Sequence, residues 1–183
     1  MKRIVALIDD IYEDLELWYP KIRLEEEGWA VVVAGPEKGR EYRGKHGYPC
    51  KADAAIDDIE TTHFDALLVP GGFAPDKLRR LEHVKDLVRR FDEEGKVIAF
   101  ICHAGWVLVS AEVLRGRRAT STVGIRDDML NAGTVWVDEP LVIDGNLVSA
   151  RTPADLAHFA RGMVEQLKRL DAVAAVRAQP AKR

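Results

Sequence analysis

The sequence has little cysteine, little net charge and no long apolar run, and each shortage excludes a class of protein. Two cysteines far apart in 183 residues build neither a disulfide framework nor a zinc-binding spacing. A formal net charge of -3 offers no basic surface to nucleic acid or to an anionic membrane. No apolar stretch approaches the roughly 20 residues that span a bilayer.

The remaining composition, 47% hydrophobic and 31% charged, is typical of a water-soluble globular protein. The apolar start at residues 4–8 is too short for a signal peptide and runs directly into Asp9 and Asp10. We therefore expect a cytoplasmic protein, whose cysteines stay reduced. The length favours one domain, which we place at residues 1–172, followed by a frayed tail at 173–183.

Short apolar runs alternate with helical patterns along most of the chain. Strands are expected at 4–8, 29–34, 64–69, 97–101, 135–137, 141–143 and 147–149. Helices are expected at 14–27, 84–92, 106–114 and 154–170, and small hairpins or a loop at 37–60. In the first helix the apolar side chains near helical spacing are Leu15, Trp18, Ile22 and Leu24. This order predicts an α/β fold, a doubly wound parallel sheet with helices on both faces.

Three segments follow strands and should meet at one edge of this sheet. They are residues 9–13, residues 71–76 and the pair Cys102 and His103. Ligands of open α/β sheets bind at the carboxyl ends of the strands. The candidate site is therefore expected there.

Cys102 lies between a predicted strand and a predicted helix. Backbone amides at such a turn favour a thiolate and can bind an oxyanion, so we expect Cys102 to be largely ionised at neutral pH. His103 could assist as a base or as a positive partner. The alternative is a small buried residue, which is the commoner role of cysteine, but the neighbouring His103 favours a reactive thiol. Cys50, on a short predicted strand, is interpreted as structural.

Ordered motifs along most of the chain resemble the DJ-1/PfpI family, in its PfpI-like, intracellular-protease branch. They are Tyr12-Glu13-Asp14-Leu15-Glu16, Gly44-Lys45-His46-Gly47-Tyr48, Leu68-Val69-Pro70-Gly71-Gly72, Ile101-Cys102-His103, Asp127-Asp128-Met129-Leu130-Asn131-Ala132-Gly133 and Arg151-Thr152-Pro153-Ala154-Asp155-Leu156. The resemblance implies a flavodoxin-like sandwich of the class I glutamine amidotransferase type, without a metal or an organic cofactor.

The resemblance also implies roles for individual residues. Cys102 is the nucleophile with His103 as its partner, and the amides of Gly72 and His103 form the oxyanion hole. Glu13 supplies a carboxyl group hydrogen-bonded to the sulfur, protonated because a second anion beside a thiolate is unfavourable. Asp76 occupies the position where PfpI-like proteins carry a glutamate that reaches the histidine of a neighbouring subunit.

The sequence departs from the family pattern at three places. Asp76 is one methylene shorter than glutamate, and without the resemblance it reads as a helix cap. Ala104-Gly105-Trp106 replaces a common Gly-Pro step, and Thr122 stands where some relatives have tyrosine. Three further acids are interpreted as complements of the helix dipole: Asp10, Asp14 and Glu16.

Two classes of function remain open. The first is an enzyme that attacks carbonyl groups, either in peptides or in small glyoxalase or deglycase substrates. The second is a stress-response redox sensor or chaperone that works by oxidation of Cys102. The expected partners are a small carbonyl compound or peptide and further copies of the chain, in a homodimer or larger assembly. Neither nucleic acid nor a membrane is expected as a partner.

Overall fold

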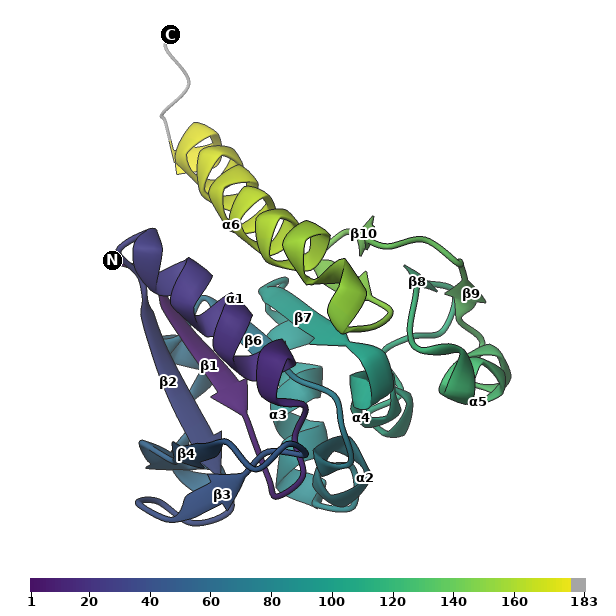
Figure 1. Cartoon of the computed structure of the whole chain (residues 1–183). Helices are drawn as coiled ribbons and strands as arrows, with labels where there is room; N and C mark the ends of the chain where they lie inside the picture. The colour runs from purple at the N-terminus through teal and green to yellow at the C-terminus, as the bar shows by residue number, and fades with distance from the viewer. Residues whose placement is uncertain (179–183) are drawn as a thin grey trace, which may run out of the picture.

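The computed structural model describes residues 1–178 of the 183, and a seven-stranded sheet lies at its centre (Figure 1). The strand order is β10-β11-β7-β6-β1-β2-β5. Neighbouring strands are parallel except β10 and β11. The strands are β1 (Arg3–Leu7), β2 (Ala30–Gly35), β5 (Ala54–Ala55), β6 (Ala66–Val69), β7 (Val97–Ile101), β10 (Val142–Asp144) and β11 (Leu147–Ala150).

Helices cover both faces of this sheet. They are α1 (Asp14–Glu26), α2 (Ala74–Leu78), α3 (Glu82–Glu93), α4 (Gly105–Ser110), α5 (Arg126–Asn131) and α6 (Leu156–Ala178). Helices α1 and α6 pack together on one face, and α3 packs with α4 on the other (Figure 1). Strands β6 and β7 are buried at every residue because both faces are covered.

The connections explain this arrangement. The chain moves from β1 to β2 in one direction along the sheet and from β6 to β7 in the other. Right-handed crossovers therefore place α1 and α3 on opposite faces. Strands β2, β1, β6, β7 and β11 follow the 2-1-3-4-5 order of flavodoxin. The predicted flavodoxin-like α/β sandwich is confirmed.

Smaller elements surround the sheet. Of the small hairpins or loop expected at 37–60, the chain forms one hairpin, from β3 (Glu41–Arg43) and β4 (Pro49–Lys51). Strand β8 (Arg118–Ala119) pairs with β9 (Val135–Trp136). Helix α4 ends at Ser110, short of the predicted 114, since Glu112 has a φ of 63°. The 3-10 turns are η1 (Ile56–Asp58), η2 (Thr61–His63), η3 (Cys102–Ala104), η4 (Val123–Ile125) and η5 (Pro153–Asp155).

Only part of the apolar set predicted for α1 faces the core, since Leu24 is buried. Leu15 and Ile22 are 57% and 54% exposed, and with Trp18 they line an open, mainly apolar groove of about 620 Å³. The face toward the sheet is formed by other residues of the helix, which are Glu16, Leu17, Pro20 and Leu24. The rotation of α1 about its axis therefore brings the acidic side chain of Glu16 to the edge of the sheet.

The C-terminal helix is longer than predicted. Helix α6 continues past residue 170 to Ala178, so residues 173–178 of the expected tail are helical. Residues 179–183 of that tail lie outside the described residues. Among the described helices, none combines the length and apolar character needed to cross a membrane.

Candidate functional site

The candidate site lies where β1, β6 and β7 end side by side. The direction of the connections reverses between β1 and β6, and this switch point opens a crevice in doubly wound folds. The loop after β1 is tied to the loop after β6 by an isolated bridge between Tyr12 and Gly72. The Glu13 N–H also donates to the Gly71 carbonyl over 3.0 Å. The loop after β1 and the loop after β6, both predicted to border the site, therefore form one wall of the crevice.

Cys102 occupies a strained turn between β7 and η3. Its φ is 63°, a region that non-glycine residues rarely adopt, so the backbone lifts the thiol out of the strand direction. The N–H groups of His103 and Gly72 donate hydrogen bonds to its sulfur. Gly72 has a φ of 79°, and a Cβ there would lie 2.4 Å from the Ile11 carbonyl oxygen. Only glycine lets this amide approach the sulfur.

Glu16 supplies the carboxyl group beside the sulfur. Its side chain is fully buried, Oε2 accepts a hydrogen bond of 2.8 Å from the Gly71 N–H, and a side-chain hydrogen bond links it to Cys102. Oε1 has no hydrogen-bond partner among the described residues, so it gives the charged form of Glu16 no further stabilisation. A Cβ at Gly71 would lie 2.5 Å from Glu16 Oε2 and 2.7 Å from Cys102 Cβ. Position 71 therefore also needs glycine.

Burial dominates the protonation of this pair. It raises the pKa of Glu16 to about 8, against the stabilising Gly71 N–H, so Glu16 is mainly protonated at neutral pH. Burial, followed by the charge of ionised Glu16, raises the pKa of Cys102 to about 12, although the amides of His103 and Gly72 oppose the rise. The predicted low pKa of Cys102 is therefore wrong in direction. The pair resists losing both protons.

His103 is placed to take the thiol proton. Its Nδ1 lies 3.3 Å from Cys102 Sγ. Burial, followed by the charge of Lys45, lowers the pKa of His103. The imidazole is therefore neutral at neutral pH and can act as a base. Of the two roles left open by the sequence, this geometry favours the base over the positive partner.

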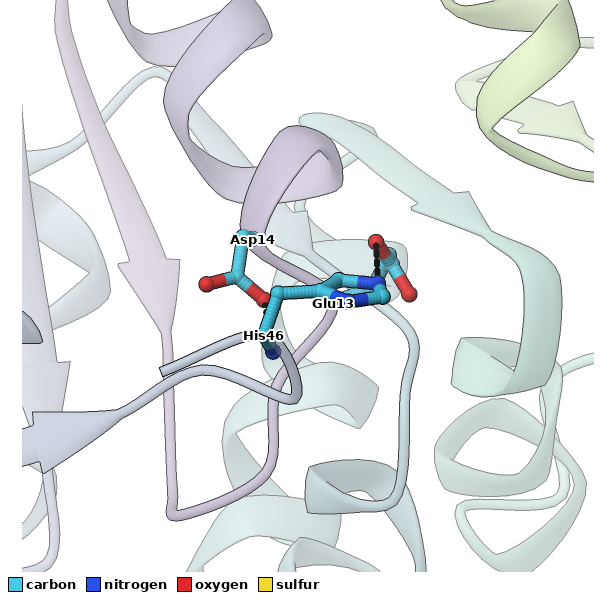
Figure 2. Close-up of side chains that lie close together, drawn as sticks. All are labelled: Glu13, Asp14 and His46. Atoms are coloured by element: carbon cyan, nitrogen blue, oxygen red, sulfur yellow. Dashed lines mark hydrogen bonds and ion pairs between the residues drawn. The ribbon is translucent and has the colours of Figure 1, made fainter. Parts of the chain in front are cut away.

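Glu13 lies beside the crevice and contacts the loop that carries His46 (Figure 2). Its Oε1 is 3.5 Å from His46 Nε2, and its Oε2 is 3.6 Å from Lys45 Nζ. The predicted hydrogen bond from Glu13 to the sulfur is therefore wrong, since Glu16 occupies that position. Glu13 precedes α1 with extended backbone, which directs its side chain away from the helix.

Asp14 holds the same loop through its backbone. Its two carboxylate oxygens accept the N–H groups of His46 and Tyr48 over 2.8 and 2.9 Å. Glu13, Asp14 and His46 can each bring one metal-ligand atom within 4.8 Å of the others (Figure 2). The Lys45 ammonium beside Glu13 competes for such a place, and Asp14 is engaged by the amides. We assign these side chains to holding the loop.

Asp76 forms an ion pair with a residue just beyond the end of its own helix. It lies in α2, and its carboxylate forms an ion pair with Arg80 one turn later. Within the described part of the chain, no hydrogen bond joins Asp76 to His103. Contact across a subunit boundary stays a prediction. Thr122 lies at the elbow, where its N–H donates to the Cys102 carbonyl over 3.3 Å.

A family model described as the DJ-1/PfpI family matches residues 2–166. The chain belongs to the DJ-1/PfpI family. It is 48% identical to the protein named "Deglycase PfpI" from Pyrococcus furiosus, covering 91% of this chain and 99% of that protein. It is 41% identical to the Bacillus subtilis protein named "Putative cysteine protease YraA", with the same coverage. Both the predicted family and an enzyme-level function in it are supported.

Solved structures of the family show the same fold. A two-domain protein from Anabaena variabilis, with DJ-1/ThiJ/PfpI-like and ferritin-like domains, gives a TM-score of 0.90 at 39% identity. The match covers 92% of this chain and 48% of that one, so this chain spans about half of its length. Drosophila melanogaster DJ-1beta gives a TM-score of 0.84 at 25% identity, and the match covers 95% of this chain and 97% of that one.

Residue-level reasoning missed three side chains at this site. Glu16 was assigned to the helix dipole, although it lies on the face of α1 that carries Leu17 and Leu24. Lys45 was noted only within a motif. Trp106 is predicted only as the start of a helix and as a departure from the family pattern, yet its ring centroid lies 5.2 Å from that of His103. Its position three residues after the histidine, at helical spacing, was the available signal.

Proposed function

We propose that this chain is a cysteine-dependent enzyme that acts on carbonyl substrates, with Cys102 as nucleophile and His103 as base. The observation that carries the proposal is the strained Cys102 turn, with imidazole, carboxyl and two amides converging on one sulfur. The proposal includes a cytoplasmic location, where the two free thiols stay reduced.

The chemistry starts from a neutral pair of thiol and imidazole. As Sγ attacks the carbonyl carbon, an S–C bond forms, the C=O π electrons move to oxygen and the thiol proton passes to His103 Nδ1. The N–H groups of Gly72 and His103 are the donors available to the new oxyanion. Protonated Glu16 faces the sulfur as a hydrogen-bond donor and adds no negative charge there.

Small carbonyl compounds are the favoured substrates. Addition to an aldehyde or ketone gives a hemithioacetal, and the related Pyrococcus furiosus protein is named a deglycase. Peptide hydrolysis uses the same addition, followed by loss of an amine that takes a proton from His103. The name of the Bacillus subtilis relative supports this second substrate class.

Steady-state assays with methylglyoxal and with fluorogenic peptides test the proposal. Cys102→Ser should abolish turnover, whereas Cys50→Ser should retain most of it, because Cys50 is buried at the β3–β4 hairpin with its pKa raised to about 11. Equal losses in the two variants would show that Cys102 is not the nucleophile.

The proposal also includes self-association, with Asp76 of one chain contacting His103 of another. Within one chain, Asp76 pairs with Arg80 on the surface, and His103 Nε2 has no hydrogen bond from the described residues. Mixing inactive Cys102→Ser chains with Asp76→Ala chains tests the shared site, provided that heterodimers form. Activity regained in verified heterodimers supports it, and a fully active Asp76→Ala variant refutes it.

The environment of the sulfur favours a redox sensor as the second candidate. A protonated Glu16 can donate a hydrogen bond to an oxygen added to Cys102 when peroxide oxidises the thiol to a sulfinic acid. Intact mass after mild peroxide tests this function. A mass gain of two oxygens without turnover of either substrate class favours the sensor. If the Glu16→Ala variant no longer shows this mass gain, the Glu16 carboxyl group is the one that stabilises the sulfinic acid.

A further inference from the structure

The imidazole of His103 has a defined contact on only one of its two nitrogens. Nδ1 faces Cys102 Sγ at 3.3 Å, but Nε2 has no hydrogen bond from the described residues. The space near Nε2 is bordered by Gly124, where a Cβ would lie 3.7 Å away. A base with one hydrogen bond can rotate about its side-chain torsions unless packing fixes the ring.

The indole of Trp106 provides that packing. Its ring centroid lies 5.2 Å from the His103 ring, at an interplanar angle of 57°, within the range of attractive aromatic pairs. His103 lies in η3, and Trp106 lies three residues later, in the first turn of α4. The indole therefore packs against the base from the first turn of α4.

The indole is itself held from two other helices. Its Nε1–H donates to Asp128 Oδ2 on α5 over 2.7 Å. From the C-cap of α2, the Arg79 guanidinium lies 5.5 Å from the indole centroid, and Arg79 Nε donates to Ser110 Oγ over 2.9 Å. A side chain fixed at its edge and its face cannot move without breaking these contacts. The orientation of Trp106 is thus set independently of His103.

We propose that Trp106 is a positioning residue, which fixes the ring orientation of His103 and shields it from water. The inference rests on the proposed role of His103 as the base, and it concerns a side chain outside the proposed transfer of a proton between Cys102 and His103. Without the indole, the ring can leave the line to the sulfur, and the proton transfer slows.

The charges around His103 define what a titration should show. Cys102 and Glu16 face it from the sulfur side, Lys45 from the loop after β3, and Arg79 and Asp128 lie behind the indole. Burial is the larger cause of the lowered pKa of His103, and Lys45 is the smaller one. Removal of the indole should hydrate the ring and move this pKa upward, toward 6.5.

The test compares the full-length protein with Trp106→Leu and Trp106→Phe. An NMR titration of the histidine rings, assigned with His103→Gln, reads the pKa of His103 without relying on turnover. We expect Trp106→Leu to raise that pKa and to lower kcat/KM by about 10- to 100-fold. Trp106→Phe keeps an aromatic face and should restore the pKa and most of the activity. A pKa and kcat/KM unchanged in folded Trp106→Leu overturn the proposal.

Two further variants separate the possible outcomes. Trp18→Leu is the matched control, a partly buried tryptophan with its N–H bonded to Tyr12, and it should leave the pKa of His103 unchanged. If Trp106→Leu does not fold, the Asp128→Ala variant tests the proposal instead. It removes the hydrogen bond that holds the indole and should also raise the pKa of His103. A fully active Cys102→Ser variant would refute the proposed function but not the role of Trp106. The titration of His103 would still report its contact with the indole.

Discussion

Replacement of Glu16 by glutamine should make the protein more stable, even though it removes a group from the centre of the candidate site. Glutamine has nearly the same shape. Its oxygen can accept the Gly71 N–H, as Glu16 Oε2 does over 2.8 Å, and its amide can donate toward the Cys102 sulfur. Glutamine differs by having no proton to lose. The substitution therefore isolates the cost of burying an ionisable group.

Protonation of Glu16 is linked to folding, and this linkage determines whether stability rises or falls with pH. The pKa of Glu16 is about 8 in the fold, against an ordinary value of 4.5, so between these pH values the folded chain binds a proton that the unfolded chain has lost. Stability is complete below pH 4.5 and falls as pH rises to about 8. At about 1.36 kcal/mol per pH unit, the upper limit of the loss is about 3 kcal/mol at pH 7 and about 5 kcal/mol at pH 8.

Urea unfolding of the wild type and Glu16→Gln, followed by circular dichroism at pH 5, 6, 7 and 8 and equal protein concentration, measures this difference. The advantage of Glu16→Gln should grow with pH. Glu82→Gln is the control, because Lys85 and then Arg89 lower the pKa of that exposed carboxylate, and its small effect should have the opposite sign. An advantage that does not change with pH would falsify the assignment of Glu16 as a proton-holding carboxyl.

Three further predictions concern the surroundings of the sulfur. Gly71→Ala should destabilise the fold by roughly 1–3 kcal/mol, because the added methyl group would lie 2.5 Å from Glu16 Oε2; an unchanged thermal midpoint contradicts that contact. The acid limb of kcat/KM should lie below pH 6.5, because burial lowers the pKa of His103, and a limb above 6.5 counts against His103 as base. Asp14→Asn should cost roughly 1–3 kcal/mol and expose loop 44–48 to proteolysis, since an amide cannot replace both accepted N–H bonds; equal cleavage rates contradict this.

The sheet and the place of Cys102 could be predicted because they depend on local signals. Strands β6 and β7 are buried on both faces, so they appear in the sequence as continuous apolar runs. The glycines after β6 and the cysteine after β7 end these runs abruptly, and parallel strands bring such ends to one edge. The pKa of Cys102 could not be predicted this way, because it depends on burial and on a carboxyl group distant in sequence.

The role expected for Glu13 came from the resemblance to the family, and the apolar pattern of α1 could not correct it. The helix has two apolar stripes, an outer one with Leu15 and Ile22 and an inner one with Leu17 and Leu24, and spacing alone does not tell which faces the sheet. The predicted apolar set combines Leu15, Trp18 and Ile22 with Leu24 of the inner stripe, so it does not define the face toward the sheet. The inner stripe continues toward the start of the helix. Positions one turn before Leu17 and Pro20 are residues 13 and 16, so both acids lie near this stripe.

Backbone geometry then separates these two acids. Glu13 is the N-cap, with φ of -76° and ψ of 116°, so its side chain leaves the helical direction and contacts Lys45 and His46. Glu16 lies inside the first turn, where the helix directs it to the Gly71 N–H and the sulfur. An acid in a first turn usually faces water and complements the helix dipole. A fully buried one must instead find donors or keep its proton, and Glu16 does both.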